Sequence, residues 1–488
     1  MDDLDADYHN IRAAFFYANG KVDLADARLY LAAALPYYWH LRSYGFVAEG
    51  LTWLRTAMID ENLLSVSARA LAFATLLNLN KLSFVHWNVE VSDSNESKRI
   101  VALAEPLFEP SLTQDTPHIS AQLMLAIGTE YSRHGNMQKA KEYAENAWRL
   151  FDLVGDKRGK GFAYNLLIWI MLMQGNVHKA QTMQEENLCF LQQDGTVWSL
   201  CEAYTMQVEL SRIMGDRNAG IDNLKQVVLF AEKEKFMTLL HDSYFMLEYF
   251  DDFNAIQLAE AFLERQRQQG DSPLLRLALH QLGRMYLNTQ QFGRAQAVLD
   301  EVLELWRRVE VPPGKGVGTH WSLLDRGQVA RLLGDFDLAI HCFTESIARF
   351  VASSFSIGGA LPLLYRGYVQ LIKNEFSGAL DDFRQCLRMV ANGPWGKHAL
   401  LVKSLAGIGE AAYHGGNIEL SAKLFPAVSL ADVERREKGI HNRSSEVADH
   451  NRIMAAIPIY LKDPVFAAAW QEGEKLSLDE AIALALAR

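Results

Sequence analysis

The residue types used in catalysis and metal binding are present in this chain, but their spacing matches no reaction site. The 14 histidines form no H-E-x-x-H pair, and no serine lies in a G-x-S-x-G turn. His441 and His450 come nearest to a metal pair, yet a zinc site usually needs three or four ligands with supporting hydrogen bonds. We interpret both as solvated loop histidines and expect no catalytic residue, no metal site and no cofactor.

One glycine-rich loop has the composition of a phosphate-binding segment. Residues 311–318 read Val-Pro-Pro-Gly-Lys-Gly-Val-Gly, and backbone amides beside glycine can approach an anion closely. A P-loop, however, follows a β-strand and places serine or threonine directly after its lysine, and this segment has neither feature. We interpret the loop as a long connection between helices.

Composition and charge exclude several classes of protein. The chain has 488 residues and a formal charge of −11 with scattered basic residues, so nucleic acid is not an expected partner. Four widely spaced cysteines form no C-x-x-C motif, which favours reduced core residues and a cytoplasmic location. The longest apolar stretch falls short of the ~20 residues that span a membrane, so we expect no membrane contact. The charge neither requires nor excludes a homodimer.

A repeated pattern indicates the elements that carry the side chains. Turn residues recur about every 40 residues with one double-length gap, and a small residue follows each turn. The turn residues are Gly135, Gly175, Gly215, Gln290, Gly334, Asn374 and Gly416. The spacing predicts helical hairpins that stack on one another. We expect the gap to contain a degenerate unit around residues 244–267.

Within most hairpins, a glycine of the first helix pairs with a small residue of the second. The pairs are Gly128 with Ala140, Gly283 with Ala295, Gly327 with Ala339, Gly367 with Ala379, and Gly409 with Ser421. We expect the helices to cross closely there, because a larger side chain would wedge them apart. Two units carry Ile168 and Val208 at the glycine position and should pack differently.

These small pairs, with a later aromatic residue such as Phe343, resemble tetratricopeptide repeats with lengthened helices. The predicted fold is all-α, a right-handed α-solenoid of tetratricopeptide-like hairpins. We divide it into N-terminal helical repeats (1–117), a tetratricopeptide-like superhelix (118–425) and a C-terminal helical cap (426–488).

Both ends of the chain carry distinctive strings. The N-terminal strings are residues 10–15 (Asn-Ile-Arg-Ala-Ala-Phe) and 49–54 (Glu-Gly-Leu-Thr-Trp-Leu), and the C-terminal string is 466–470 (Phe-Ala-Ala-Ala-Trp). These strings resemble a bacterial family, the helical sensor half of LuxR-type and AfsR-type STAND regulatory ATPases. The resemblance runs from Asn10 to Ala487. No G-x-x-x-x-G-K-[ST] motif occurs, so the ATPase module of that family is missing here. The chain is then either the sensor part of a longer regulator or a stand-alone relative.

The helix register predicts a binding surface. In tetratricopeptide repeats the first helix of each pair lines the concave face, so residues opposite the packing glycine should point into it. The predicted ligand- or partner-binding residues are Asn165, Trp169, Glu209, Arg212, His280, Arg284, Trp321, Gln328, Arg331, Tyr368, Lys403 and Tyr413. The alternative is that these are ordinary exposed residues of a solenoid.

Three of these residues suggest a specific ligand chemistry. We hypothesise that Arg284, Arg331 and Lys403 form a cationic strip for an acidic group of a peptide or metabolite. The sequence therefore predicts a non-enzymatic sensor that binds a partner protein, a peptide or a small effector. Two alternatives stay open: a stand-alone peptide-binding regulator of the quorum-sensing type, and an enzyme with a site of dispersed groove residues.

Overall fold

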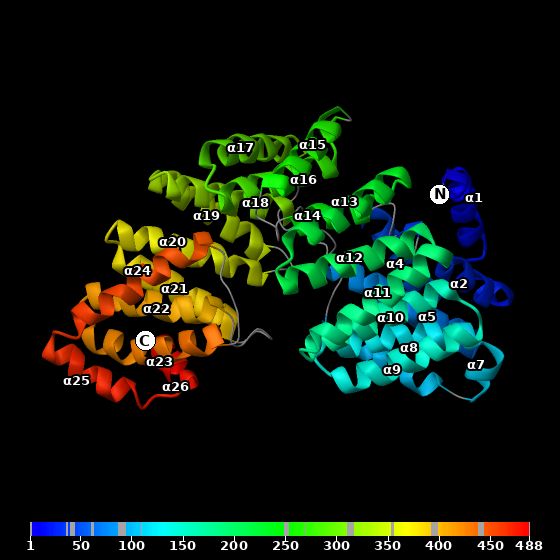
Figure 1. Cartoon of the computed structure of the whole chain (residues 1–488), viewed down its shortest axis with the longest axis horizontal. Helices are drawn as coiled ribbons and strands as arrows, with labels where there is room; N and C mark the ends of the chain where they lie inside the picture. The colour runs from blue at the N-terminus through cyan, green and yellow to red at the C-terminus, as the bar shows by residue number, and fades with distance from the viewer. Residues whose placement is uncertain are drawn as a thin grey trace. The chain divides into compact units, whose positions relative to one another are not determined.

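The described part of the chain is helical throughout and contains no strand, which confirms the all-α prediction (Figure 1). The computed structural model describes residues 2–35, 38–39, 44–59, 63–85, 94–108, 110–247, 253–268, 270–309, 317–352, 356–391, 399–437 and 444–487. The chain divides into two compact units, Met1–Phe250 and Asp251–Arg488. This division differs from the three predicted regions, whose boundary after residue 425 falls inside the helix Ile418–Glu437.

The first unit begins with irregular helices and continues as helical hairpins. Its helices are α1 (Asp2–Tyr17), α2 (Ala25–Ala33), α4 (Tyr44–Ala57), α5 (Val66–Val85), α6 (Ser94–Ala104), α7 (Pro110–Asp115), α8 (Pro117–Arg133), α9 (Met137–Leu153), α10 (Lys157–Met173), α11 (Val177–Asp194), α12 (Val197–Met214), α13 (Arg217–Lys233) and α14 (Met237–Leu247), with 3-10 turns η1 (Val22–Leu24) and η3 (Glu105–Leu107). Successive helices contact one another from α8 to α14.

The second unit repeats the hairpin and ends with three further helices. Its helices are α15 (Phe253–Gln268), α16 (Pro273–Asn288), α17 (Phe292–Arg308), α18 (Val317–Leu332), α19 (Phe336–Ala352), α20 (Ala360–Ile372), α21 (Phe376–Ala391), α22 (Ala399–His414), α23 (Ile418–Glu437), α24 (Ser444–Tyr460), α25 (Pro464–Gly473) and α26 (Leu478–Leu486), with the 3-10 turn η5 (Ser356–Gly359). The described residues of the proposed degenerate unit at 244–267 are helical and belong to α14 and α15, while residues 248–252 lie outside the described part.

The predicted turns are confirmed by their backbone conformation. All seven turn residues have positive φ, including the non-glycine residues Gln290 (φ 61°) and Asn374 (φ 59°). In this left-handed region a residue can end a helix and let its amide bond the preceding carbonyls. Glycine adopts the conformation without steric cost, which explains why it fills most of these positions.

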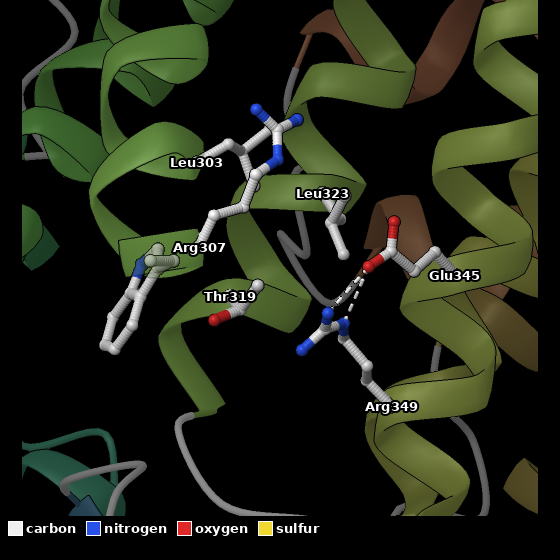
Figure 2. Close-up of a pocket in the computed structure, with 7 residues that line it drawn as sticks. Leu303, Arg307, Thr319, Leu323, Glu345 and Arg349 are labelled. Atoms are coloured by element: carbon white, nitrogen blue, oxygen red, sulfur yellow. Dashed lines mark hydrogen bonds and ion pairs between the residues drawn. The ribbon is translucent and has the colours of Figure 1, made fainter. Parts of the chain in front are cut away.

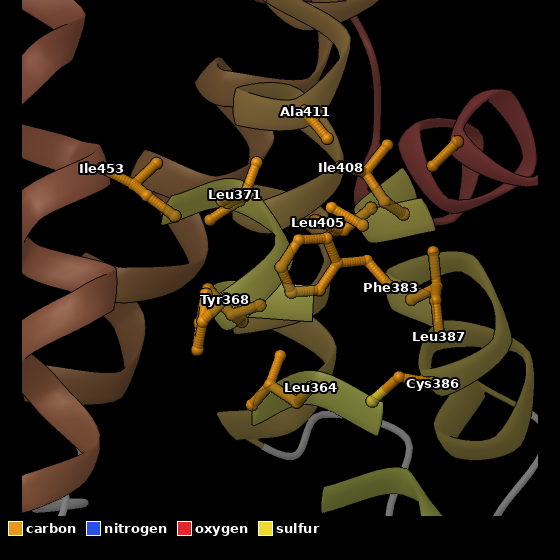
Figure 3. Close-up of a cluster of buried hydrophobic side chains, with 14 of the residues drawn as sticks. Leu364, Tyr368, Leu371, Phe383, Cys386, Leu387, Leu405, Ile408, Ala411 and Ile453 are labelled. Carbon is orange, nitrogen blue, oxygen red and sulfur yellow. The ribbon is translucent and has the colours of Figure 1, made fainter. Parts of the chain in front are cut away.

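The packing glycines confirm a close crossing of the paired helices and show what fills it. A Cβ atom on Gly327 would lie 2.6 Å from Phe343 Cε1, and one on Gly367 would lie 2.8 Å from Phe383 Cε1. The aromatic ring one turn beyond the predicted small residue therefore occupies the space above Gly327 and Gly367, and Leu299 occupies it above Gly283. Figure 3 shows Phe383 within the buried cluster of the second unit.

The two units without a packing glycine do pack differently, as predicted. Ile168 and Val208 are fully buried at the glycine position. In the hairpin of Ile168, the position taken by Phe343 and Phe383 elsewhere carries Gln184, whose Nε2 donates to the Ala203 carbonyl at 2.6 Å. A larger residue on one helix is thus matched by a non-aromatic residue on the other.

Aromatic and small residues at both ends fill helix contacts. Trp39 is fully buried, its Nε1 donates to Tyr8 Oη at 2.9 Å, and a Cβ on Gly50 would lie 2.2 Å from its ring. Near the C-terminus, a Cβ on Gly473 would lie 2.6 Å from the Lys423 carbonyl oxygen. Gly50, within the string 49–54, therefore has a packing role, and Gly473 just beyond the string 466–470 has one too.

The cysteine prediction is confirmed for three residues and wrong for one. Cys201, Cys342 and Cys386 are buried free thiols, whereas Cys189 on α11 is exposed. Burial raises the pKa of Cys201 to about 12, so this thiol stays protonated.

Within the described residues, no single helix is long and apolar enough to cross a membrane. Residues 448–460 and 464–473 pass the test of length and composition only together, as a pair bent by 117°.

Candidate partner-binding face

Four successive first helices of the second unit form one continuous face. Helices α16, α18, α20 and α22 contact one another in that order. We call the following set the inner face: His280, Arg284, Trp321, Gln328, Arg331, Tyr368, Lys403 and Tyr413. Helix α24 lies on these helices, since it contacts α16 and α22 directly (Figure 1). Figure 3 shows its Ile453 beside Leu371 and Tyr368 of α20.

Arg331 links the inner face to α24. Its Nη1 donates to Asp449 Oδ2, 118 residues further along the chain, and its Nε donates to Gln328 Oε1 at 2.7 Å. The guanidinium carbon also lies 5.6 Å from the centre of the Tyr365 ring. Arg331 is only 7% exposed, so a charge that would normally be hydrated is paired with a carboxylate from another helix.

Tyr368 and Lys403 are buried on the neighbouring helices, each with 1% exposure. Burial, reinforced by the nearby Asp449 charge, raises the pKa of Tyr368 well above its ordinary value. The Tyr368 hydroxyl and Arg331 Nη2 have no hydrogen-bond partner among the described residues. The interpretation of these residues as ordinary exposed ones is therefore wrong for Arg331, Tyr368 and Lys403.

A second polar group lies where α16 meets α18. His280 Nδ1 is 3.2 Å from Ser322 Oγ, and its Nε2 is 3.7 Å from Asp325 Oδ2. Arg284 Nε lies 3.4 Å from the same Asp325 oxygen, and its guanidinium lies 6.0 Å from the Trp321 ring. Burial, reinforced by the charge of Arg284, lowers the pKa of His280 to about 3, so this imidazole is neutral at pH 7.

The far end of the inner face holds the last turn of α24. The Tyr413 ring stacks on the Tyr460 ring at 3.8 Å between centres. The Tyr460 hydroxyl donates to Glu410 Oε2 at 2.9 Å, and Arg452 Nη1 lies 3.4 Å from Glu410 Oε1. Glu410 is 3% exposed, so both contacts serve a buried carboxylate.

The predicted residues of the first unit keep short-range partners. Asn165 accepts a hydrogen bond from Asn187 Nδ2 at 2.8 Å, and Trp169 packs against the buried cluster that α9 to α12 form. Arg212 Nε donates to Glu209 Oε2 at 2.8 Å, and the Arg212 side chain is exposed. These four residues are therefore positioned within or between neighbouring helices.

The predicted cationic strip was expected to bind an acidic group of a ligand, but carboxylates of the chain itself already pair with two of its residues. Arg284 is paired with Asp325, and Arg331 is paired with Asp449. The sequence interpretation missed Asp325, Asp449 and Glu410, although Asp325 lies one turn from two predicted residues and could have been found by the same register. The binding role of the predicted residues stays a prediction.

One histidine interpretation is wrong, and the interpretations of a second histidine and of the glycine-rich loop fall on residues that are not described. His450 is 3% exposed on α24, because this helix is buried against the inner face, whereas a solvated loop was expected. His441 and residues 311–316 of the glycine-rich loop are not described. The part of the chain that is described holds no group of three or more histidine, cysteine, aspartate or glutamate residues fit for a metal ion.

A separate pocket of about 250 Å³ lies among α17, α18 and α19 (Figure 2). It is lined by Leu303, Trp306, Arg307, Thr319, Leu323, Glu345 and Arg349. Its charged pair is internally satisfied, because Arg349 Nη2 donates to Glu345 Oε1 at 2.7 Å. None of the residues predicted from the sequence lines this pocket.

Comparisons with known proteins support the repeat fold. The tetratricopeptide repeat family model matches residues 274–350, which extend from α16 into α19. No curated protein matches the chain.

Similar solved structures include a Rap protein complexed with competence and sporulation factor (10% identity, TM-score 0.44, 96% of this chain and 99% of that chain). A STAND protein with a tetratricopeptide repeat sensor from Pyrococcus horikoshii is 12% identical (TM-score 0.42, 88% of this chain and 54% of that chain). The apo quorum sensor NprR from B. thuringiensis is also 12% identical (TM-score 0.36, 66% of this chain and 99% of that chain). At such low identities and TM-scores, these neighbours assign no function to the chain.

Proposed function

We propose that the chain is a non-enzymatic sensing module whose inner face in the second unit binds a protein or peptide partner. The tetratricopeptide repeat is a protein-interaction fold, and its matched segment contains α16 and α18. These two helices carry five of the eight inner-face residues. The interaction role thus rests on the same helices that hold Arg284 and Arg331.

The observation that carries this proposal is the contact between the inner face and α24. A helix is held there by an arginine–carboxylate pair at Arg331 and by a ring stack at Tyr413. Charged hydrogen bonds and aromatic stacking are also the contacts by which protein surfaces select partners. The face therefore has chemistry suited to an extended or helical peptide with an acidic group.

The resemblance of both chain ends supports a finer assignment. We assign the module to the sensor part of a bacterial LuxR-type or AfsR-type regulator in the cytoplasm, with a partner protein, peptide or small effector as its input. Asn165, Trp169, Glu209 and Arg212 would form a second contact surface on the first unit. The peptide-binding regulator of the quorum-sensing type is the nearest alternative, because it would use the same inner face.

Selection from a phage-displayed peptide library tests the proposal on the purified full chain. Peptides enriched on the native chain should lose at least ~10-fold in affinity when Arg284→Gln and Arg331→Gln are combined, because each lost charged hydrogen bond costs ~1.5–3 kcal/mol. Arg307→Gln with Arg308→Gln is the matched control, since both side chains are exposed on α17. Selection that enriches no peptide, or peptides that bind the Arg284/Arg331 variant equally well, would contradict the proposal.

A further inference from the structure

Helix α24 covers the inner face through an interface that combines apolar packing with buried charged groups. Arg331, Asp449 and Glu410 are buried charged groups at or beneath this helix. Burying such groups costs desolvation energy, and a buried ion pair often adds little net stability compared with apolar packing. Surfaces that must separate are typically more polar than permanent ones.

The same contact leaves buried donors unused. Arg331 Nη2 and the Tyr368 hydroxyl have no hydrogen-bond partner among the described residues, although Asp449 is close enough to influence the charge state of Tyr368. A buried polar group without a partner is destabilising. An occupant that carries further acceptors at this point would therefore satisfy the inner face better than α24 does.

The backbone of α24 is weak as a helix in its own right. Pro458 lies inside it, two residues before its end at Tyr460. Proline has no amide hydrogen and removes a helical hydrogen bond to the residue four positions earlier. The helix is consequently held by its contacts with α16, α18, α20 and α22 rather than by its own propensity.

The contacts of α24 define a pattern that another helix could present. Asp449 meets Arg331, Ile453 and Ile457 enter the buried cluster of the second unit, and Tyr460 stacks on Tyr413. These four residues recur at the spacing of one helix face. Their order defines one helix face with a carboxylate first and apolar groups after it.

We propose that α24 is an exchangeable occupant of the inner face, replaced by a partner helix with a carboxylate and apolar residues spaced as Asp449, Ile453, Ile457 and Tyr460 are. This inference rests on the proposed function, because it takes the inner face as the binding surface. It adds that the surface is closed within the chain and opens when α24 leaves. The covalent link keeps α24 at a high effective concentration, typically millimolar, so a partner must bind better than α24 to replace it.

Thiol labelling of the full chain measures the opening without any ligand. The exposed thiol is removed by Cys189→Ser, a reporter is introduced by Ile453→Cys, and buried Cys386 on α21 serves as the internal reference. We expect the reporter to react at least ~10-fold faster than Cys386, because local openings precede global unfolding. Equal rates would overturn the inference, since α24 would then open only when the whole unit unfolds.

Two variants test whether the ion pair controls the opening. Asp449→Asn should speed the reporter roughly 100-fold and leave Cys386 unchanged, because it removes one partner of a buried pair. If the labelling of Cys386 also becomes faster, Asp449→Asn has unfolded the unit. Arg452→Gln is then used in its place. That side chain is about half exposed beside Glu410, so a roughly threefold acceleration of the reporter alone is expected.

Arg384→Gln is the matched control, since Arg384 bonds the carbonyls of Ala485 and Ala487 rather than α24. It should leave the reporter rate unchanged. If Asp449→Asn unfolds the unit and Arg452→Gln, made alone, does not change the labelling rate of the reporter, the inference is also overturned.

A synthetic peptide of residues 444–460 tests the chemistry of the partner. The target is the full chain carrying Asp449→Asn. We expect the native peptide to bind it at least ~10-fold more tightly than a peptide in which Asp449 is also replaced by Asn. Adding Arg331→Gln to the target chain should remove this difference. A chain that opens yet binds both peptides equally, or neither, overturns the assigned partner chemistry. It would leave the library selection, and with it the proposed function, unaffected. A dimer formed by Asp449→Asn in light scattering would instead identify a second copy as the occupant.

Discussion

The two units place an arginine at the same register position in opposite surroundings. Arg212 on α12 and Arg331 on α18 each lie one turn after the packing position, and each donates through Nε to the side chain three residues earlier. In the first unit that side chain is the carboxylate of Glu209, and Arg212 remains exposed. In the second it is the amide of Gln328, and the arginine is buried against Asp449.

The exchange of an acid for an amide explains the difference in partners. Glu209 neutralises its arginine locally, whereas Gln328 accepts a hydrogen bond but leaves the positive charge uncompensated. A buried positive charge requires a carboxylate from elsewhere, and α24 supplies it. The same repeat thus forms a locally paired surface in one unit and a surface that recruits a distant helix in the other.

The largest expected effect tests the packing difference between the units. Phe383→Ala should lower the free energy of unfolding of the second unit by ~4 kcal/mol, because a buried aromatic ring between Gly367 and Gly407 would be lost. Gln184→Ala, at the matching position of the first unit, should cost only ~1 kcal/mol with its hydrogen bond. Hydrogen exchange of each unit in denaturant measures both values, and equal losses would refute the distinction.

Replacement of Arg331 and of Arg212 should lower the unfolding free energy by different amounts. Arg331→Gln leaves Asp449 buried without its partner and should cost ~3 kcal/mol of unfolding free energy in the second unit. Arg212→Gln removes an exposed pair and should cost less than ~0.5 kcal/mol in the first. Denaturant titration of the two variants provides the comparison, and similar costs would show that the burial of Arg331 has no energetic weight.

The buried histidine gives the second unit a specific pH dependence. The pKa of His280 is lowered from 6.5 to about 3. When the pH falls below 6.5, the imidazole therefore binds a proton in the unfolded chain but stays neutral in the folded chain. Its stabilising contribution is therefore complete above that pH and is lost progressively toward pH 3. Between pH 7 and pH 5 the native chain should lose ~2 kcal/mol more than His280→Gln does. Parallel pH profiles of the two proteins would contradict this.

Exchanging the acid and the amide between Glu209 and Gln328 should have the smallest effect on stability. Gln328→Glu gives Arg331 a local carboxylate that competes with Asp449, so the closed position of α24 should weaken by ~1 kcal/mol. Glu209→Gln makes the opposite change at the exposed pair and should alter stability by less than ~0.5 kcal/mol. Hydrogen exchange of α24 and α12 reads out the two effects, and no change in α24 would remove Gln328 from the explanation.

The hairpins could be predicted because their determinants are local. Glycine at Gly334 or asparagine at Asn374 suits a positive φ, and a small residue such as Gly327 is needed where two helices cross. The register of the first helices followed from these positions. It included Arg331 and Tyr413, which both contact α24, at Asp449 and Tyr460 respectively.

The closure of that face could not be predicted from the same pattern. Arg331 and Asp449 are separated by 118 residues, and no repeat relates α24 to the inner helices. Pro458 also lowers the helix propensity of this segment, so the sequence gives little indication that a helix forms there. His450 lies in a polar stretch of the sequence, which is why it is interpreted as a loop residue although it is buried.

Segment-resolved hydrogen exchange of the unmodified chain tests the central claim most directly. If α24 is an exchangeable occupant of the inner face, its amides between Asp449 and Tyr460 should exchange at least ~100-fold faster than those of α20 beneath it. Addition of a peptide selected on the inner face should increase exchange in α24 and decrease it in α20. Equal protection of the two helices, unaffected by such a peptide, would show that α24 is a permanent part of the core and would contradict the account.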